Sequence, residues 1–159
     1  MTVHCAKRAV KASSVTRSIE IDAPVEEVFA FVADPLRTMN AMDTLGRVVV
    51  SDVETTPQGT VRSWKWTERF RLVPFSVHAK VTRHEQTPNQ RIVEKHSTGP
   101  VCTYSLEPSG DGTRLTYIAE LARPLALLTK VQAFITTKGK GMESDMDKFL
   151  VAIKQQLEA

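Results

Sequence analysis

Two titratable side chains, Glu94 and His96, stand two residues apart in a short segment of alternating character. In a β-strand this spacing puts both on one face, where a carboxyl group and an imidazole can act as a proton-transfer pair. Ile92 has the same parity, whereas Arg91 and Lys95 have the other and prefer water. We therefore expect Ile92, Glu94 and His96 to face the interior. A solvated sheet edge is the alternative for the two titratable residues.

Aromatic and methionine side chains supply the other groups that can contact a ligand. Trp64 and Trp66 share the parity of Phe70, and Tyr104 and Tyr117 lie on the apolar faces of two later segments. An apolar lining with a few polar groups is typical of a small-molecule site, although the same residues also suit a packed core. The predicted ligand-binding residues are Trp64, Trp66, Phe70, Phe75, Val77, Tyr104, Tyr117, Met39, Met42, Met142 and Met146. Glu68 shares the tryptophan parity, but a solvated strand end suits it better.

Other site chemistries find little support. His78 and His84 are six residues apart and have no third ligand near them, so no metal site is predicted. The chain contains no phosphate-binding loop, and no cofactor is predicted. Cys5 and Cys102 are too far apart for a zinc motif or a disulfide framework, which favours two reduced thiols in a cytoplasmic protein.

The basic charge of the chain is concentrated at one end. Residues 1–14 contain Lys7, Arg8 and Lys11 and no acid, and the other 18 of the 21 basic residues balance the 18 acidic ones. The segment has no apolar core of a secretory signal, so it is interpreted as a basic flexible leader before a domain at 15–158. A neutral domain is a poor nucleic-acid binder, and no apolar run is long enough to span a membrane.

Seven strands and three helical segments are expected around these residues. Pro24 and two glutamates open a first helix that Asp34-Pro35 ends, and a second short helix is expected at 35–42. A long helix is expected at 124–157, with a weak centre at Thr136–Gly141. Turn signals divide the rest into an antiparallel meander. The predicted strands are at about 15–22, 46–54, 60–70, 75–86, 91–97, 101–107 and 113–122.

This order of elements resembles the START-like, or SRPBCC, superfamily, and most closely its polyketide cyclase/dehydrase branch. The resemblance is carried by the run from Ser18 to Pro35, by Gly112–Thr116 and by Lys154–Glu158. It implies an α+β helix-grip fold, in which a seven-stranded curved antiparallel sheet wraps around the long C-terminal helix. The stretch from Leu36 to Met42 departs from the family pattern because it lacks the tryptophan that many relatives carry there.

The resemblance implies a cavity between the sheet and the C-terminal helix, without specifying its use. One hypothesis is binding or carriage of a hydrophobic small molecule such as a lipid, a quinone or a polyketide. A second is a cyclase or dehydratase that uses Glu94, His96 or the tyrosine hydroxyls. A third is a protein-interaction module of the chaperone-activator type. Monomer and homodimer remain open.

Overall fold

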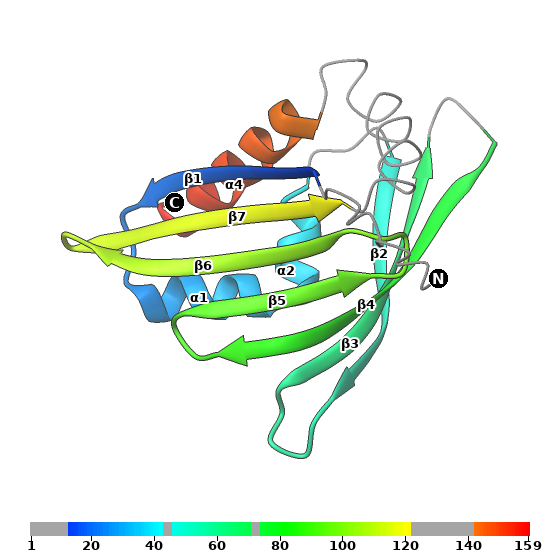
Figure 1. Ribbon diagram of the computed structural model, residues 1–159, viewed down its shortest axis with the longest axis horizontal. Helices are drawn as coiled ribbons and strands as arrows, with labels where there is room; N and C mark the ends of the chain where they lie inside the picture. The colour runs from blue at the N-terminus through cyan, green and yellow to red at the C-terminus, as the bar shows by residue number, and fades with distance from the viewer. Residues whose placement is uncertain (1–12, 43–45, 71–73, 122–141) are drawn as a thin grey trace, which may run out of the picture.

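The computed structural model describes residues 13–42, 46–70, 74–121 and 142–159 (Figure 1). Its centre is one antiparallel sheet in which the strands lie in the order β1-β7-β6-β5-β4-β3-β2. Strands β2 to β7 thus form a meander, and β1 pairs with β7 as an edge strand of the sheet. The strands are β1 (Ser13–Ile21), β2 (Gly46–Thr55), β3 (Val61–Phe70), β4 (Ser76–Thr87), β5 (Arg91–His96), β6 (Val101–Ser109) and β7 (Gly112–Leu121).

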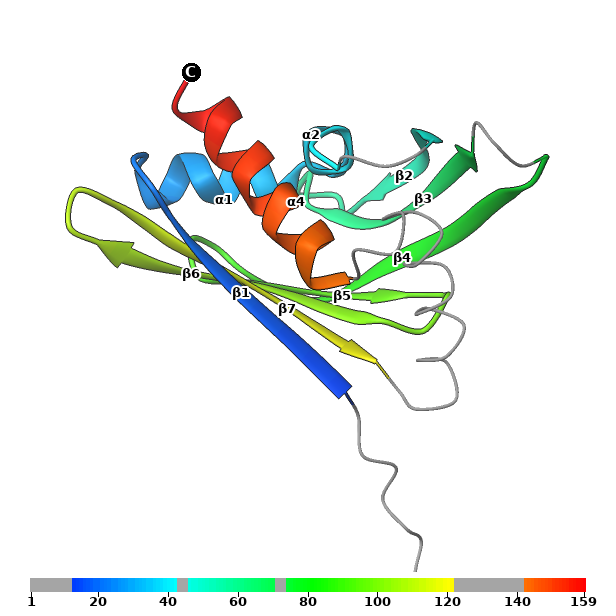
Figure 2. The same cartoon turned by 90° about the horizontal axis from the view of Figure 1, so that it is seen from above.

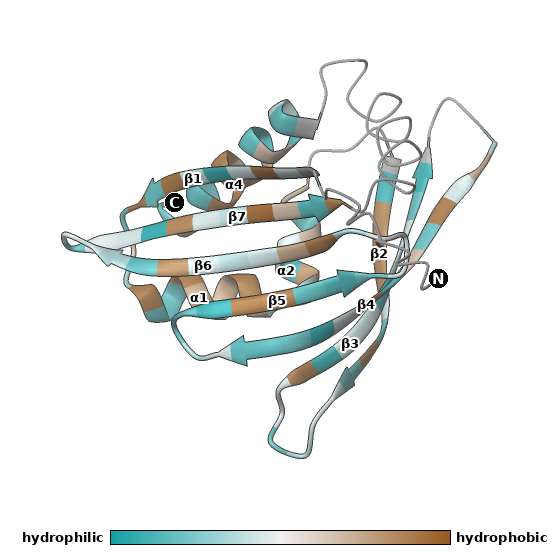
Figure 3. Ribbon diagram, viewed as in Figure 1, coloured by the Kyte–Doolittle hydropathy of each residue, from teal (hydrophilic) through white to brown (hydrophobic). Residues whose placement is uncertain are grey.

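Alternation of residue type explains which face of the sheet is buried. Along β7 the buried residues include Leu115, Tyr117, Ala119 and Leu121, and the residues between them are more exposed. Figure 3 shows this alternation as hydrophobic and hydrophilic bands along the strands. A tight turn at Gly110, whose positive φ of 59° suits glycine, joins β6 to β7 and fixes their register.

The first two helices form where the sequence predicts them. Helix α1 (Val25–Ala33) begins after Pro24, and its most buried residues are Val28, Phe31 and Val32. Helix α2 (Pro35–Asn40) begins at once, because the carboxylate of Asp34 accepts a hydrogen bond from the backbone N–H of Leu36 at 2.9 Å. Both helices lie on the concave side of the sheet (Figure 2).

Helix α4 (Met142–Leu157) crosses the same side of the sheet as α1 and α2 (Figure 2). Arg17 of β1 ties the start of the helix to the sheet through ion pairs with Glu143 at 2.8 Å and Asp147 at 3.1 Å. At the other end, the Lys154 ammonium donates to the backbone carbonyl of Glu20 at 2.7 Å. The α+β class, the seven-stranded antiparallel sheet and the helix-grip arrangement are thereby confirmed.

Element boundaries differ from the predicted ones by a few residues. β1 begins at Ser13, which pairs with Leu121, so the strand includes the last two residues of the predicted leader. α2 ends at Asn40 rather than at residue 42. The remainder of the leader, at 1–12, lies outside the described residues, as do the first part of the predicted helix 124–157 and its weak centre at Thr136–Gly141. Within the described ranges, no helix combines the length and apolar character needed to cross a bilayer.

Candidate functional site

Most of the predicted site residues fall into two groups of side chains on the inner, concave face of the sheet. The first group, here called the tyrosine cluster, contains Tyr104, Tyr117, Met146 and Phe149 and lies under α4. The second, here called the tryptophan cluster, lies over β3 and β4 and consists of Met39, Trp64, Trp66, Ala79 and Val81. Met42 packs against both clusters and is partly buried.

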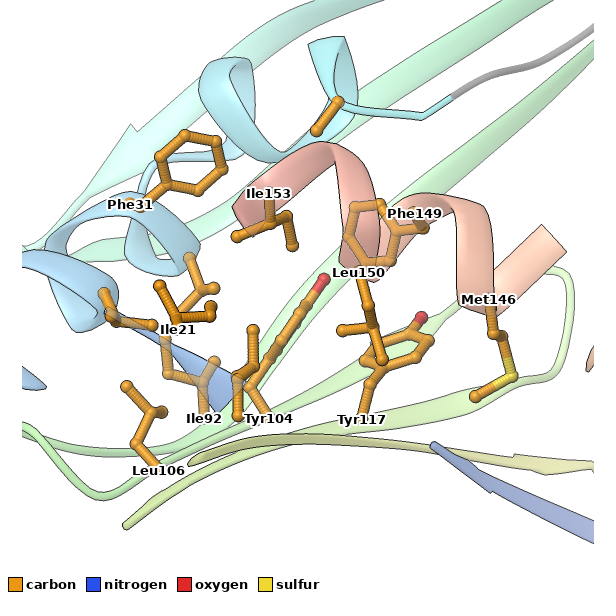
Figure 4. Close-up of a cluster of buried hydrophobic side chains, with 14 of the residues drawn as sticks. Ile21, Phe31, Ile92, Tyr104, Leu106, Tyr117, Met146, Phe149, Leu150 and Ile153 are labelled. Carbon is orange, nitrogen blue, oxygen red and sulfur yellow. The ribbon is translucent and has the colours of Figure 1, made fainter. Parts of the chain in front are cut away.

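The tyrosine cluster is closely packed. The rings of Tyr104 and Tyr117 are 4.9 Å apart between centroids, and Phe149 of α4 lies 5.4 Å from Tyr117 in an edge-to-face arrangement (Figure 4). Burial raises the pKa of both tyrosine hydroxyls well above the usual value, so they stay protonated. Burial also raises the pKa of the neighbouring Cys102 thiol to about 12, which makes this cysteine unreactive.

The tryptophan cluster lies on the part of the sheet that α4 does not cover, next to α2 and β2. Trp64 and Trp66 are two residues apart on β3, so both side chains lie on the inner face, where they pack on Val81 and Ala79 of β4. Val48 and Val50 of β2 complete the packing from the sheet edge. Aromatic and aliphatic cross-strand pairs of this kind stabilise a sheet, but they also form the wall of an apolar site.

A buried ion pair lies between the two clusters. The Nε of Arg83 donates to Oε1 of Glu94 at 3.0 Å, and the two side chains are only 3% and 4% exposed. Arg83 also donates to Gln86 at 3.0 Å, and its guanidinium lies 5.1 Å from the ring centroid of Trp64. Burial raises the pKa of Glu94 to about 7, although Arg83 acts in the opposite direction.

The imidazole of His96 lies beside Trp66. The indole Nε1 of Trp66 donates to Nδ1 of His96 at 3.4 Å. Burial lowers the pKa of His96 to about 4, so the ring is neutral at pH 7 and carries its proton on Nε2. The inward parity predicted for Ile92, Glu94 and His96 is confirmed, and the alternative of a solvated edge for Glu94 is wrong.

A groove opens between α2 and β2, next to the tryptophan cluster. Its volume is about 400 Å³. Met39 belongs to the tryptophan cluster and Met42 packs against it, and both also line the groove, so the groove adjoins the tryptophan cluster. The lining residues are Leu36, Met39, Asn40, Met42, Arg47, Val48, Val49 and Val50.

The structure corrects two expectations of side-chain placement. Glu68, expected at a solvated strand end, is 5% exposed: β3 continues to Phe70 and Glu68 is paired with Val48 and Val77 on both sides, so it is not at a strand end. Phe75, expected on the inner face, precedes β4 and is 49% exposed, because the alternation of that strand begins only at Ser76. The side chains of Phe70 and Met142 lie outside the described part of the structure.

Arg83 is the central residue that the sequence interpretation missed. It continues the inward parity of Val77, Ala79 and Val81, and this alternation was the available signal. Arginine normally prefers water, so a sequence argument stops at Val81. The groove residues on β2 were missed because only the tertiary structure brings α2 against that strand. Among the described residues, no group of three or more side chains has the composition of a metal site.

Comparison with known proteins agrees with this architecture. The sequence model of a family described as polyketide cyclase/dehydrase and lipid transport matches residues 12–158. No curated protein matches the chain significantly.

Solved structures similar to this chain share its fold at low identity. A protein from Chromobacterium violaceum is 17% identical with a TM-score of 0.67, over 92% of this chain and 99% of that one. One from Arthrobacter aurescens is 17% identical with a TM-score of 0.67, over 91% and 86% of the two chains. One from Thermus thermophilus is 18% identical with a TM-score of 0.62, over 92% and 97%.

Proposed function

The chain belongs to the polyketide cyclase/dehydrase and lipid transport family, and from that premise we propose that it binds an apolar small molecule on the inner face of its sheet, against the tryptophan cluster. The observation that carries this proposal is the groove between α2 and β2. Met39, Met42 and β2 valines line it together with the polar Asn40 and Arg47, and the two methionines are also part of, or packed against, the tryptophan cluster. The proposal therefore places the ligand on the tryptophan side of the sheet, not under α4.

The chemistry of this region suits an apolar guest. Methionine side chains are unbranched and polarizable, so Met39 and Met42 adapt to different ligand shapes. Burial of ~200 Å² of apolar ligand surface contributes about 5 kcal/mol at ~25 cal/mol per Å², before the cost of association is subtracted. Micromolar affinity thus needs no charged contact, and specificity depends on the few polar groups nearby.

Intrinsic fluorescence tests the proposal directly, because Trp64 and Trp66 are the only two tryptophans of the chain. Long-chain fatty acids, quinones and aromatic polyketides are titrated separately, and we expect a saturable change for at least one class. The single variants Trp64→Phe and Trp66→Phe assign the change to one indole. The proposal is wrong if no class produces a saturable change. A stable complex with a protein partner and no bound small molecule would instead support an interaction module.

Glu94 favours a second candidate function, a cyclase or dehydratase. A buried carboxyl group with a pKa of about 7 is suited to proton transfer at neutral pH. For this function we expect Glu94→Gln to retain ligand affinity but lose turnover. Equal turnover by Glu94→Gln and the original protein would exclude Glu94 as the acid or base.

A further inference from the structure

Three buried hydrogen-bond donors on the inner face have no acceptor within the part of the chain that the structure describes. They are Nη2 of Arg83, Nε1 of Trp64 and Nε2 of His96. The last is a donor because Nδ1 of His96 already accepts from Trp66. Buried polar groups are nearly always paired in folded proteins, so three unpaired donors in one region need an explanation.

The strand register places all three donors around one residue, Val81. Trp64 of β3 and His96 of β5 are the register partners of Val81 on its two sides. Arg83 is two residues further along β4, on the same face, and its guanidinium lies against the Trp64 ring. Neighbouring strands are about 4.8 Å apart, so the three side chains share a single patch of the inner face.

Charge decides which acceptor fits this patch. The positive charge of Arg83 is already opposed by Glu94, which accepts from its Nε at 3.0 Å. Above its pKa of about 7 Glu94 is ionised, and a ligand carboxylate would then bring a second negative charge close to it in a buried site, which is unfavourable. A neutral carbonyl oxygen accepts the same hydrogen bonds without changing the charge balance.

We propose that Arg83, Trp64 and His96 determine specificity by donating hydrogen bonds to neutral carbonyl oxygens of an otherwise apolar ligand. This inference rests on the proposed function, since it names the polar end of the same site. The ligand reaches the patch from the groove between α2 and β2 by displacing Met39 and Met42, whose flexible side chains pack over the tryptophan cluster.

A matched set of probes tests the inference by calorimetry at about pH 8.5, where Glu94 is ionised. Acetylnaphthalene, ethylnaphthalene and naphthoate, substituted at the same ring position, present a ketone, a hydrocarbon and a carboxylate on one scaffold. We expect the ketone to bind about tenfold more tightly than the hydrocarbon, as one or two added hydrogen bonds predict. The carboxylate should bind no better than the hydrocarbon.

Two conservative variants connect the preference to the donors. Trp64→Phe removes an indole N–H that has no acceptor among the described residues, and Arg83→Lys keeps the charge opposite Glu94 while removing the guanidinium fork. We expect each variant to reduce the ketone-to-hydrocarbon affinity ratio at least threefold, and this ratio cancels any loss of apolar contact that the two probes share. The infrared carbonyl stretch of bound acetylnaphthalene should lie below its value in hexane, and Trp64→Phe should reduce this shift.

The outcomes separate the two proposals. Equal affinities for the ketone and the hydrocarbon overturn the carbonyl preference and leave apolar binding intact. Tightest binding of naphthoate overturns it as well, because the site would then select an anion. If none of the three probes binds, the carbonyl preference is wrong, and the fluorescence titrations decide the proposed function separately. If Arg83→Lys does not fold, Trp64→Phe and the infrared shift still decide the question.

Discussion

Arg83 of β4 and Glu94 of β5 are register partners, and they form a 3.0 Å ion pair whose side chains are almost entirely buried. Removing two charges from water is costly, and the pair tolerates burial because each side chain compensates the other. Just beyond the pair, β4 and β5 shift register between Arg83 and Glu85. The pair therefore joins the two clusters at an irregular point of the sheet.

Removing one partner of this pair should cost more than removing both. We expect Arg83→Met to lower the free energy of unfolding by about 3–5 kcal/mol, because Glu94 then stays buried without its cation. The double variant Arg83→Met/Glu94→Leu should recover most of that loss. Urea unfolding measures both changes. The exposed pair between Lys65 and Asp52, 2.9 Å apart, provides the control, and Lys65→Met should change stability little. Additive losses in the double variant would contradict the coupling.

The pH dependence of stability should reveal two opposing groups. Burial raises the pKa of Glu94 from 4.5 to about 7, so the folded protein binds more protons than the unfolded chain in that window. Glu94 alone therefore makes stability fall as pH rises from 4.5 to 7. Burial lowers the pKa of His96 from 6.5 to about 4, so His96 alone makes stability rise between pH 4 and 6.5. The two effects largely cancel in the intact protein.

Single variants should expose each effect separately. As the pH rises from 4 to 6.5, the free energy of unfolding of Glu94→Gln should increase by about 3 kcal/mol more than that of the intact protein, because the His96 effect is then unopposed. As the pH rises from 4.5 to 7, the free energy of unfolding of His96→Gln should decrease by about 3 kcal/mol more than that of the intact protein. Denaturant unfolding over this pH range measures both slopes. Identical pH profiles for the intact protein and the two variants would show that neither group has the expected pKa.

Gly112 should be intolerant of any side chain. A Cβ atom at this position would lie 2.3 Å from the backbone carbonyl oxygen of Ile21, so β1 or β7 would have to move. At Gly110, a Cβ atom meets nothing within 4 Å, and the cost there is the positive φ of 59° alone. We expect Gly110→Ala to cost about 1 kcal/mol and Gly112→Ala at least twice that. Thermal unfolding compares the two variants, and equal losses would show that the close approach is easily relieved.

The boundary of the domain should lie at the start of β1. Residues 1–12 are basic and unpatterned in sequence, whereas Ser13 and Ser14 pair with Leu121 and Glu120 of β7. We propose that deletion of residues 1–12 leaves the melting temperature within a few degrees. Deletion of residues 1–16 should lower it clearly, because the shortened β1 leaves part of β7 unpaired. Calorimetric melts distinguish the two, and a large loss in the shorter deletion would contradict a separable leader.

Local pattern was sufficient for the seven strands, the first two helices and much of the inner face. Strict alternation put Trp64 and Trp66 together on one side of β3, and it put Ile92, Glu94 and His96 together on one side of β5. The placement follows from a period of two residues, which every strand imposes on its side chains. Helix α1 was equally predictable, since a proline and two glutamates open it.

Contacts between elements were beyond the reach of pattern. Arg83 and Glu68 have residue types that prefer water, and only neighbouring strands and the layer above the sheet decide that they are buried. The separation of Trp64 from Tyr104 into different clusters also depends on tertiary structure, because α1 and α4 pack on the part of the sheet that holds Tyr104, whereas α2 packs on β2 beside the tryptophans. Sequence thus determined which side chains face inward. The packing of the helices determined which of them lie in a filled core and which lie behind a groove.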